Sequence, residues 1–265
     1  MKVSVVVPAR YESSRYPGKP LVALRGAGGA ARSLVQRSWE AATAAQGVNE
    51  VVVATDDERI AEAARAFGAQ VAMTPAECRN GTERCAAALP DLDAPDLVVN
   101  LQGDAPLTPP WFVEDLIAAM AADAAAQVAT PVLRCDAEAL AAFKADRAAG
   151  RVGGTTAVFD AGGRALYFSK EVLPYTGEAW QGGPLPKVFH HVGVYAYRPA
   201  ALTAYAAWPE GPLERREGLE QLRFLENRTA LSCVEVQARG RVFWEVNNPA
   251  DVPRVEAALA AAGID

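Results

Sequence analysis

Short apolar runs alternate with amphipathic stretches over the first hundred residues. Residues 3–7 are apolar apart from Ser4, which is typical of a central parallel strand covered on both faces. Residues 33–45 carry apolar side chains at helical spacing and predict an amphipathic helix. The same reasoning predicts further strands at 51–54, 70–73 and 97–101, and further helices at 58–67 and 82–89.

This alternation indicates an α/β fold with a doubly wound, mostly parallel sheet of the Rossmann-like kind. Ligands of such sheets bind beyond the carboxyl ends of the strands. Conspicuous polar loops follow Val7, Ala54 and Leu101, each at the end of a predicted strand. We therefore expect the functional residues in these three loops.

The pattern changes from about residue 137. We interpret residues 1–265 as a single domain and residues 137–232 as a smaller α+β lobe inserted into it, which would carry the second substrate and dimer contacts. The elements predicted in the second half are a hairpin with strands at 151–159 and 165–168, strands at 192–197 and 233–236, and helices at 213–225 and 249–262.

Composition narrows the possible ligands. With 51% hydrophobic residues and a net charge of −6, the chain has enough apolar residues for a core but no broad positive field to attract nucleic acid or an anionic membrane. The four cysteines show no C-x-x-C spacing, and no apolar stretch approaches membrane-spanning length. We expect a cytoplasmic protein that binds a small anion through a local cluster of basic residues.

The loop at 8–21, P-A-R-Y-E-S-S-R-Y-P-G-K-P-L, is the strongest candidate for that cluster. It places Arg10, Arg15 and Lys19 directly after the first strand, and a triphosphate needs such fixed positive charge along its oxygens. A solvated basic loop is the plain alternative, but the position after a buried strand favours phosphate binding. The loop is not a Walker P-loop, because G-x-x-x-x-G-K-[ST] is absent.

Further motifs extend over most of the chain. They are V-A-T-D at 53–56, N-G-T-E-R at 80–84, V-N-L-Q-G-D-A-P at 99–106, A-L-Y-F-S-K at 165–170, H-H-V-G-V-Y-A-Y-R at 190–198 and P-L-E-x-x-E-x-L-E-Q-L-R at 212–223. Together with the loop at 8–21, they resemble the motifs of 3-deoxy-manno-octulosonate (Kdo) cytidylyltransferases. Any one of them alone, except the first loop, would be a weak signal.

The resemblance implies a Mg²⁺-dependent nucleotidyltransferase, usually a homodimer. Members of the family transfer CMP from CTP to the anomeric hydroxyl of Kdo or a related 3-deoxy-2-ulosonic acid and release pyrophosphate. By position, Lys19, Arg10 and Asp104 correspond to the catalytic residues. The nucleotide pocket corresponds to Ala9, Arg10, Arg15, Lys19, Asp56, Thr82 and Gln102.

The metal and sugar sites also follow from the resemblance. Asp104 and Asn247 stand at the two metal positions, and a carboxylate after a strand suits Mg²⁺, although it could also be a turn residue or helix cap. The sugar positions are His191, Tyr195, Glu220, Gln221 and Ser169, with Lys170 nearby. Without the resemblance, these polar residues would be assigned to a strand edge and an exposed helix face.

Three departures from the family motifs stand out. The motif G-V-D-T-P-E-D-L is replaced by E-V-N-N-P-A-D-V at 245–252, so Asn247 stands where a metal-binding aspartate is expected. An amide oxygen can ligate Mg²⁺, but without a charge the site should be weaker. Asn248 or Asp251 could compensate, although a capping or solvent-facing role suits Asp251 better. In addition, Q-G-D-E-P has lost an acid at Ala105, and N-x-V-K at 153–156 has lost its lysine.

These departures leave several functions open. The acceptor could be a related 2-ulosonic acid, an amino-substituted Kdo, a sialic-acid-like sugar or a phosphonate. Asn247 also raises the possibility of a catalytically silent nucleotide-binding homologue. A glycosyltransferase that uses Asp104 to hold a nucleotide sugar is a third option, which the complete basic loop disfavours.

Overall fold

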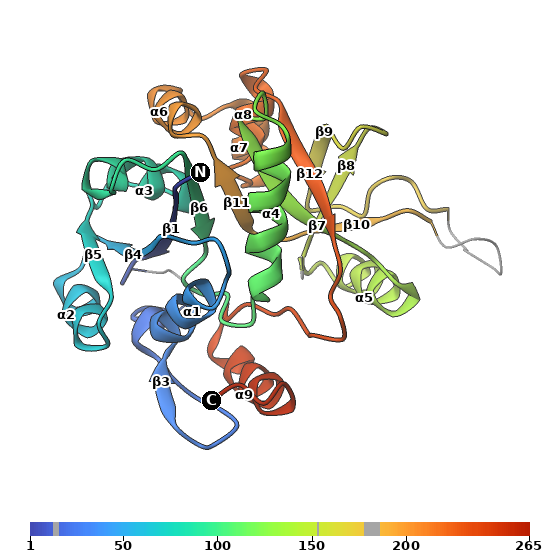
Figure 1. Ribbon diagram of the computed structural model, residues 1–265. Coiled ribbons are helices and arrows are strands. Elements are labelled where there is room, and N and C mark those ends of the chain that lie inside the picture. Colours follow the sequence, from blue (N-terminus) through green and yellow to red (C-terminus); the bar gives the residue numbers. More distant parts are fainter. Residues whose placement is uncertain (13–15, 153, 178–185) are drawn as a thin grey trace.

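The computed structural model describes residues 1–12, 16–152, 154–177 and 186–265. In this part of the chain, ten strands form one sheet, and helices pack on both of its faces (Figure 1). A small separate hairpin of β2 (Ala23–Arg25) and β3 (Ala31–Ser33) lies near the C-terminal helix.

The first half of the chain builds the parallel part of the sheet, in the order β5-β4-β1-β6. Each of these strands agrees with a predicted strand to within two residues, and the predicted α/β fold is confirmed. Their bounds are β1 Val3–Ala9, β4 Glu50–Thr55, β5 Gln70–Met73 and β6 Leu97–Leu101.

The remainder of the sheet is largely antiparallel, so the sheet as a whole is mixed. β11 lies between β6 and β7 and is antiparallel to both, whereas β10, β8 and β9 continue the sheet beyond β7. β12 pairs with β7 in parallel. The bounds are β7 Val128–Arg134, β8 Thr155–Phe159, β9 Ala165–Ser169, β10 Phe189–His191, β11 Val194–Tyr197 and β12 Leu231–Val236.

The strand predicted at 192–197 corresponds to β11, which begins two residues later, whereas the short strand β10 before it was not predicted. β10 and β11 run along the same edge of β7, but their register shifts across Val192 and Gly193. β11 then also pairs with β6, so the chain bends from the outer sheet into its centre. This irregularity resembles a bulge, which re-aims the side chains on either side of it. Periodicity alone does not reveal such a break.

The first three helices follow the predictions and begin at side-chain caps. Ser33, Asp57 and Asn80 each accept a hydrogen bond from a backbone N–H of the first turn, at α1, α2 and α3 respectively. The helix bounds are α1 Leu34–Thr43, α2 Glu58–Ala66, α3 Gly81–Ala88, α4 Pro110–Ala122, α5 Ala137–Ala148, α6 Pro199–Ala207 and α9 Val252–Ala261, with 3₁₀ turns η1 Lys19–Leu21, η2 Leu89–Asp91 and η3 Pro249–Asp251. Five of the elements, α4, α5, α6, β7 and β10, and the β2–β3 hairpin were not predicted from the sequence.

The helix predicted at 213–225 is two helices, α7 (Pro212–Glu217) and α8 (Leu222–Glu226). Gly218 ends α7 in the left-handed conformation, with φ of +62°, which is a common helix C-terminus for glycine. The intervening turn carries Glu220 and Gln221. Because of the break, these two side chains point inward and do not form an exposed helix face.

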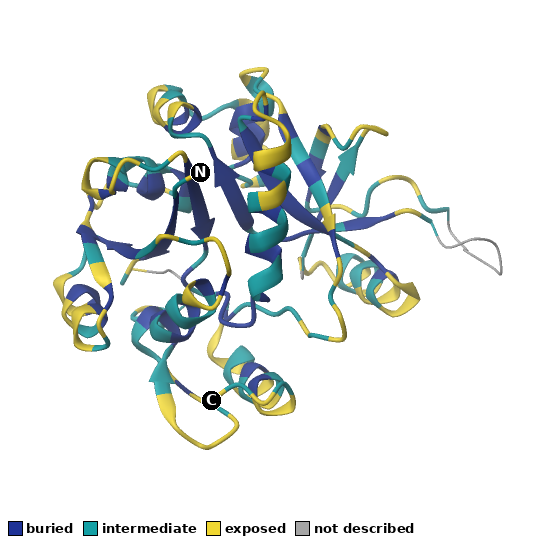
Figure 2. Cartoon of the chain, in the orientation of Figure 1, coloured by how far each residue is buried: buried dark blue, intermediate teal, exposed yellow. Residues whose placement is uncertain are grey.

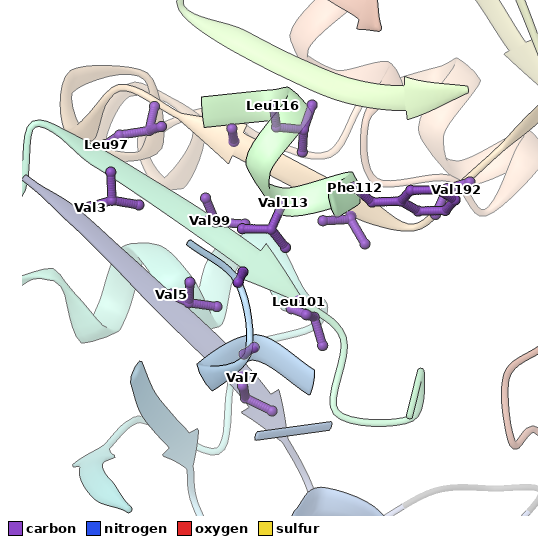
Figure 3. Close-up of a cluster of buried hydrophobic side chains, with 14 of the residues drawn as sticks. Val3, Val5, Val7, Leu97, Val99, Leu101, Phe112, Val113, Leu116 and Val192 are labelled. Carbon is purple, nitrogen blue, oxygen red and sulfur yellow. The ribbon is translucent and has the colours of Figure 1, made fainter. Parts of the chain in front are cut away.

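Alternation along β1 explains how the sheet is buried on both faces. Val3, Val5 and Val7 pack with α4 and the matching side of β6, where Figure 3 shows them beside Leu97 and Val113. Val6 points to the opposite face, toward α3 and α6. The strands are accordingly the most buried elements in Figure 2, while the outer faces of the helices are exposed.

The boundary of the inserted lobe at 137–232 stays a prediction. This segment supplies β8, β9, β10 and β11, which are hydrogen-bonded into the same sheet as the parallel strands. The segment therefore continues the main sheet through β11.

The carboxyl ends of β1 and β6 meet at Gly103. A Cβ added at Gly103 would lie 2.5 Å from the carbonyl oxygen of Pro8, closer than carbon and oxygen atoms approach without a bond. The Gly103 N–H also donates to that oxygen, at 3.3 Å. The absence of a side chain at this position therefore lets the loop after β6 lie directly against the loop after β1.

Gly103→Ala tests this contact. The clash is with backbone, which cannot rotate away, so we expect a loss of about 1–3 kcal/mol in the free energy of unfolding, as in other overpacked sites. Urea unfolding measures it. Gly162→Ala, where an added Cβ comes no closer than 3.4 Å to its one near neighbour, is the matched control and should change stability by less than about 0.5 kcal/mol. Equal effects of the two substitutions would contradict the close approach.

Candidate active site

A cavity of about 190 Å³ opens where β1, β6 and the start of α3 come together. Five of the residues predicted for nucleotide binding or catalysis line it: Ala9, Arg10, Lys19, Gln102 and Asp104. Arg15 lies outside the described residues. The polar loops after β1 and β6 therefore meet at one site, as the position of the strand ends predicts.

Lys19 and Asp104 are in direct contact in this cavity. The Nζ atom of Lys19 lies 2.5 Å from Oδ2 of Asp104, and the two side chains are 13% and 28% exposed. An ammonium group and a carboxylate this close form a charge-assisted hydrogen bond. The contact joins two loops that are 85 residues apart in the sequence.

Asp56 and Thr82 lie behind the first cavity and do not line it. Arg84, which does line it and is only 3% exposed, has its Nη1 atom 3.4 Å from Oδ1 of Asp56 and donates to Oγ1 of Thr74 at 2.6 Å. The hydroxyl groups of Thr82 and Tyr197 are 2.8 Å apart. Asp56 and Thr82 thus hold Arg84 and α3 in position. Arg84 was not among the predicted residues, although it ends the N-G-T-E-R motif.

A second, larger cavity of about 890 Å³ adjoins the first, and Gln102 and Asp104 line both. The residues predicted for the sugar and for the second metal position that line it are His191, Tyr195, Glu220, Gln221 and Asn247, together with the nearby candidate Lys170. Ser169 does not line it, because its buried hydroxyl donates to Oε1 of Glu217 at 2.8 Å.

Glu220, which lines the larger cavity, is bonded to the start of α3 and to Gln102. Its Oε2 atom accepts the N–H of Thr82 at 2.9 Å, and its Oε1 atom accepts from Nε2 of Gln102 at 3.2 Å. Burial raises the pKa of the Glu220 carboxyl above its ordinary value, against the opposing effect of the Thr82 hydrogen bond. Tyr195 donates to Oε1 of Gln221 at 3.1 Å, so the floor of the larger cavity is a connected polar surface.

His191 is neutral and its tautomer is fixed by its neighbours. Oγ1 of Thr130 lies 2.8 Å from the carbonyl oxygen of Val194, to which it donates, so it accepts from Nε2 of His191 at 3.1 Å. The Nδ1 atom therefore accepts, with the hydroxyl of Thr155 at 3.2 Å. Burial lowers the pKa of His191 to about 3, with a smaller contribution from His190. At neutral pH His191 is therefore uncharged and adds no positive charge to the cavity.

A buried ion network supports the wall formed by α7 and α8. Arg223, 1% exposed, donates from Nη2 to Oε1 of Glu214 at 2.6 Å and from Nη1 to Oε1 of Glu83 at 2.9 Å. Its guanidinium also lies over the ring of Tyr205, 4.1 Å from the centroid. Since Glu83 belongs to α3, this network ties the helix beside the first cavity to the wall of the second. The network was not predicted from the sequence.

The extended segment at 242–247 forms another wall of the larger cavity. The N–H of Val246 donates to the carbonyl oxygen of Asp104 at 3.0 Å, which holds this segment beside the loop after β6. Asp251 accepts from the backbone N–H groups of Asn247 and Asn248, at 2.9 and 2.7 Å. Asp251 therefore caps the turn before α9, in agreement with the capping role suggested for it.

The residues available for a metal ion are oxygen donors. Within the described ranges, no group of three or more His, Cys, Asp or Glu side chains is arranged to hold a metal ion. Asp104 and Asn247 nevertheless line the same cavity. In the described part of the chain, none of the helices has the length and apolar character needed to cross a membrane.

A partly parallel α/β sheet, with cations and a carboxylate converging at its carboxyl edge, is the arrangement expected of a nucleotidyltransferase. The family model described as "Cytidylyltransferase" matches residues 4–231. The chain belongs to the cytidylyltransferase family, and within it to the 3-deoxy-manno-octulosonate cytidylyltransferases.

The similarity extends over the full chain. The 3-deoxy-manno-octulosonate cytidylyltransferase of Maricaulis maris is 43% identical over 99% of both chains, and that of Syntrophotalea carbinolica is 39% identical over 98% of this chain and 99% of the relative. The solved structure of CMP:2-keto-3-deoxy-manno-octonic acid synthetase complexed with CTP superposes with a TM-score of 0.84, at 34% identity, and covers 99% of this chain and 100% of the other.

Asp104→Ala should abolish turnover and leave the fold intact. The Lys19–Asp104 pair is partly exposed, so its loss should cost about 1 kcal/mol or less in stability, whereas pyrophosphate release should fall at least about a hundredfold. Asp93→Ala, which breaks a surface pair with Lys2, is the control and should keep full activity. A collapsed thermal transition in Asp104→Ala would instead assign this residue a structural role.

The buried His191 should make the fold sensitive to acid. Its pKa is about 3 in the folded chain and about 6.5 when unfolded, so below pH 6.5 the unfolded chain binds a proton that the folded chain does not. The contribution of neutral His191 to the free energy of unfolding is therefore fully present above pH 6.5 and is lost as the pH falls below it. From pH 7.5 to 5.5 this histidine should remove about 1.4 kcal/mol.

Urea unfolding at these two pH values measures the effect. In His191→Gln, which has no group that titrates in this range, the difference between the two pH values should be smaller by that amount. An unchanged difference would show that His191 titrates normally in the folded chain.

Proposed function

We propose that this chain transfers CMP from CTP to the anomeric hydroxyl of Kdo or a closely related 3-deoxy-2-ulosonic acid and releases pyrophosphate. The observation that carries the proposal is the contact of Lys19 with Asp104 at the junction of the two cavities. It gives one site a cation for phosphate oxygens and a carboxylate for a metal ion. The names of the relatives, and the CTP bound to the similar synthetase of known structure, support the same reaction.

The first cavity suits the nucleotide. Arg10 and Lys19 line it together with Pro8 and Ala9, and Arg84 adds a buried cation to the lining. Such preorganised positive charge stabilises a triphosphate most strongly as pyrophosphate leaves and the charge on its oxygens grows. When a triphosphate binds, Lys19 can exchange its contact with Asp104 for one with phosphate.

The donor set at the cavity junction fits Mg²⁺. This ion prefers hard oxygen ligands and usually takes one or two carboxylates together with substrate phosphates. Asp104 supplies a carboxylate and Asn247 an amide oxygen from the adjoining wall. Bound there, Mg²⁺ would neutralise charge on the phosphates and orient them for displacement.

The mechanism is a direct displacement. The acceptor, held in the second cavity, attacks the α-phosphorus of CTP with its anomeric oxygen, and the bond from that phosphorus to the β-phosphate oxygen breaks. Arg10 and Lys19 would stabilise the leaving pyrophosphate, and Gln102, which lines both cavities, would lie between the two substrates. The residues imply no covalent intermediate with the enzyme.

The second cavity suits a polyhydroxylated acid. His191, Tyr195 and Gln221 present donors and acceptors in a fixed arrangement, as recognition of sugar hydroxyls requires. Lys170 also lines the cavity and could meet a carboxylate. Thr156 stands where the N-x-V-K motif has its lysine. It is buried, donates to the carbonyl oxygen of Glu171 at 2.7 Å and does not line the cavity. The loss of a lysine there therefore gives little support to an altered acceptor.

The location and assembly remain parts of the proposal. We expect the protein in the cytoplasm, from its composition and cysteine usage, and as a homodimer, because the family resemblance implies one. Its partners are then CTP and an acidic sugar, with no nucleic acid and no membrane. A sialic-acid-like sugar or phosphonate as acceptor, and a silent nucleotide-binding homologue, are the alternatives that an assay must separate.

Pyrophosphate release from CTP and Mg²⁺ across a panel of acceptors tests the proposal. The panel contains Kdo, an amino-substituted Kdo, a sialic acid and a phosphonate. We expect turnover with Kdo at a rate typical of enzymes, about 1–1,000 per second, and CMP in the sugar product by mass spectrometry. Turnover with only another acceptor would overturn the assignment of Kdo. CTP binding without turnover of any acceptor would favour the silent homologue.

A further inference from the structure

The wall at 242–247 presents two polar side chains to the larger cavity, Glu245 and Asn247. Between them, Val246 is fully buried in a cluster with Leu24 and Leu34. Val246 thus packs into the core, while Glu245 and Asn247 on either side of it line the cavity. The hydrogen bond from Val246 to Asp104 keeps both beside the loop after β6.

Residues 245–247 contain one carboxylate, as the family motif does, but at a different position. The family motif G-V-D-T-P has glycine at the position of Glu245 and aspartate at the position of Asn247. In this chain, position 245 carries glutamate in place of glycine, and position 247 carries asparagine, the amide of aspartate. The formal charge of the three-residue stretch is therefore unchanged, and the additional methylene of glutamate extends the reach of the displaced carboxylate.

The structure provides a place for this carboxylate. A Cβ added at Gly193 would lie 3.3 Å from Oε1 of Glu245 and 3.8 Å from Cγ of Gln102, so the Glu245 side chain occupies space that a larger residue at 193 would fill. Gln102 lines both cavities and is two residues from Asp104. The carboxylate of Glu245 thus extends from the C-terminal wall toward the loop that carries Asp104.

We propose that Glu245 provides the second carboxylate of the magnesium site, together with Asp104, in place of the aspartate that the family motif has at position 247. The proposal rests on the proposed function, since it concerns the metal that accompanies CTP. Two carboxylates and phosphate oxygens are a usual ligand set for Mg²⁺, whereas Asp104 with the neutral amide of Asn247 would bind it more weakly. In the free chain, the Nζ atom of Lys19 lies 2.5 Å from Oδ2 of Asp104, so a positive charge is already placed beside this carboxylate.

Calorimetric titration with CTP, at saturating Mg²⁺ and again in EDTA, tests this inference without a turnover assay. The ratio of the two dissociation constants is the gain in CTP affinity that the metal provides. In Glu245→Gln, which keeps the shape but removes the charge, we expect this gain to fall about tenfold or more. Adding Asn247→Asp to the same chain restores a carboxylate at the family's position and should recover most of it.

Glu235→Gln is the matched control. Glu235 is an exposed carboxylate on β12 that lines neither cavity, so its loss should leave the metal-dependent gain unchanged. Thermal unfolding of every variant checks that the fold is retained. The double variant recovers the metal-dependent gain in CTP affinity only if a carboxylate at position 247 can replace the one at position 245. A general structural effect of Glu245→Gln would not be reversed in this way.

Two outcomes overturn the inference. If Glu245→Gln keeps the full metal-dependent gain, Glu245 does not hold the metal, and an accompanying rise in the KM for Kdo would make it a contact of the sugar. If the loss is not recovered by Asn247→Asp, the two positions are not equivalent and the exchange is wrong. Failure of the proposed function is distinguishable, because the unmodified chain would then bind no CTP or release no pyrophosphate.

Discussion

The contact of Lys19 with Asp104 requires two loops from neighbouring parallel strands to meet at one edge of the sheet. β1 and β6 are hydrogen-bonded side by side, so their carboxyl ends coincide, and Gly103 allows the second loop to lie against the carbonyl of Pro8. The Asp104 loop in turn receives a hydrogen bond from Val246, so the C-terminal wall is positioned from the same point. Both cavities are therefore organised around this edge.

The parallel half of the fold could be predicted from the sequence because its strands and helices depend on interactions between residues that are close together in the chain. A strand buried on both faces has a continuous apolar run, as in β1, and a helix cap such as Asp57 satisfies an N–H within its own first turn. The outer half was less predictable. The break between β10 and β11 follows from the simultaneous pairing of β11 with β6 and β7, which no local pattern encodes.

The candidate site divides in the same way. The loop at 8–21 and Asp104 are evident from strand ends and charge, and they do come together. Which of the buried polar residues face a cavity, and which only bond to other side chains, is not evident from the sequence. Ser169 resembles a sugar contact but is bound to Glu217, and Arg84 resembles an ordinary helix residue but faces the first cavity. Such roles depend on tertiary pairing, which only the folded chain determines.

The position of Glu220 has a thermodynamic consequence. The carboxylate of Glu220, in the larger cavity, receives both the N–H of Thr82 at the start of α3 and the amide of Gln102, which lines both cavities. A ligand that draws Gln102 away leaves Glu220 with a different set of donors and so alters the support of α3. Linkage requires any such effect to be mutual: occupancy of one chamber changes the affinity of the other by the same factor in either order of addition.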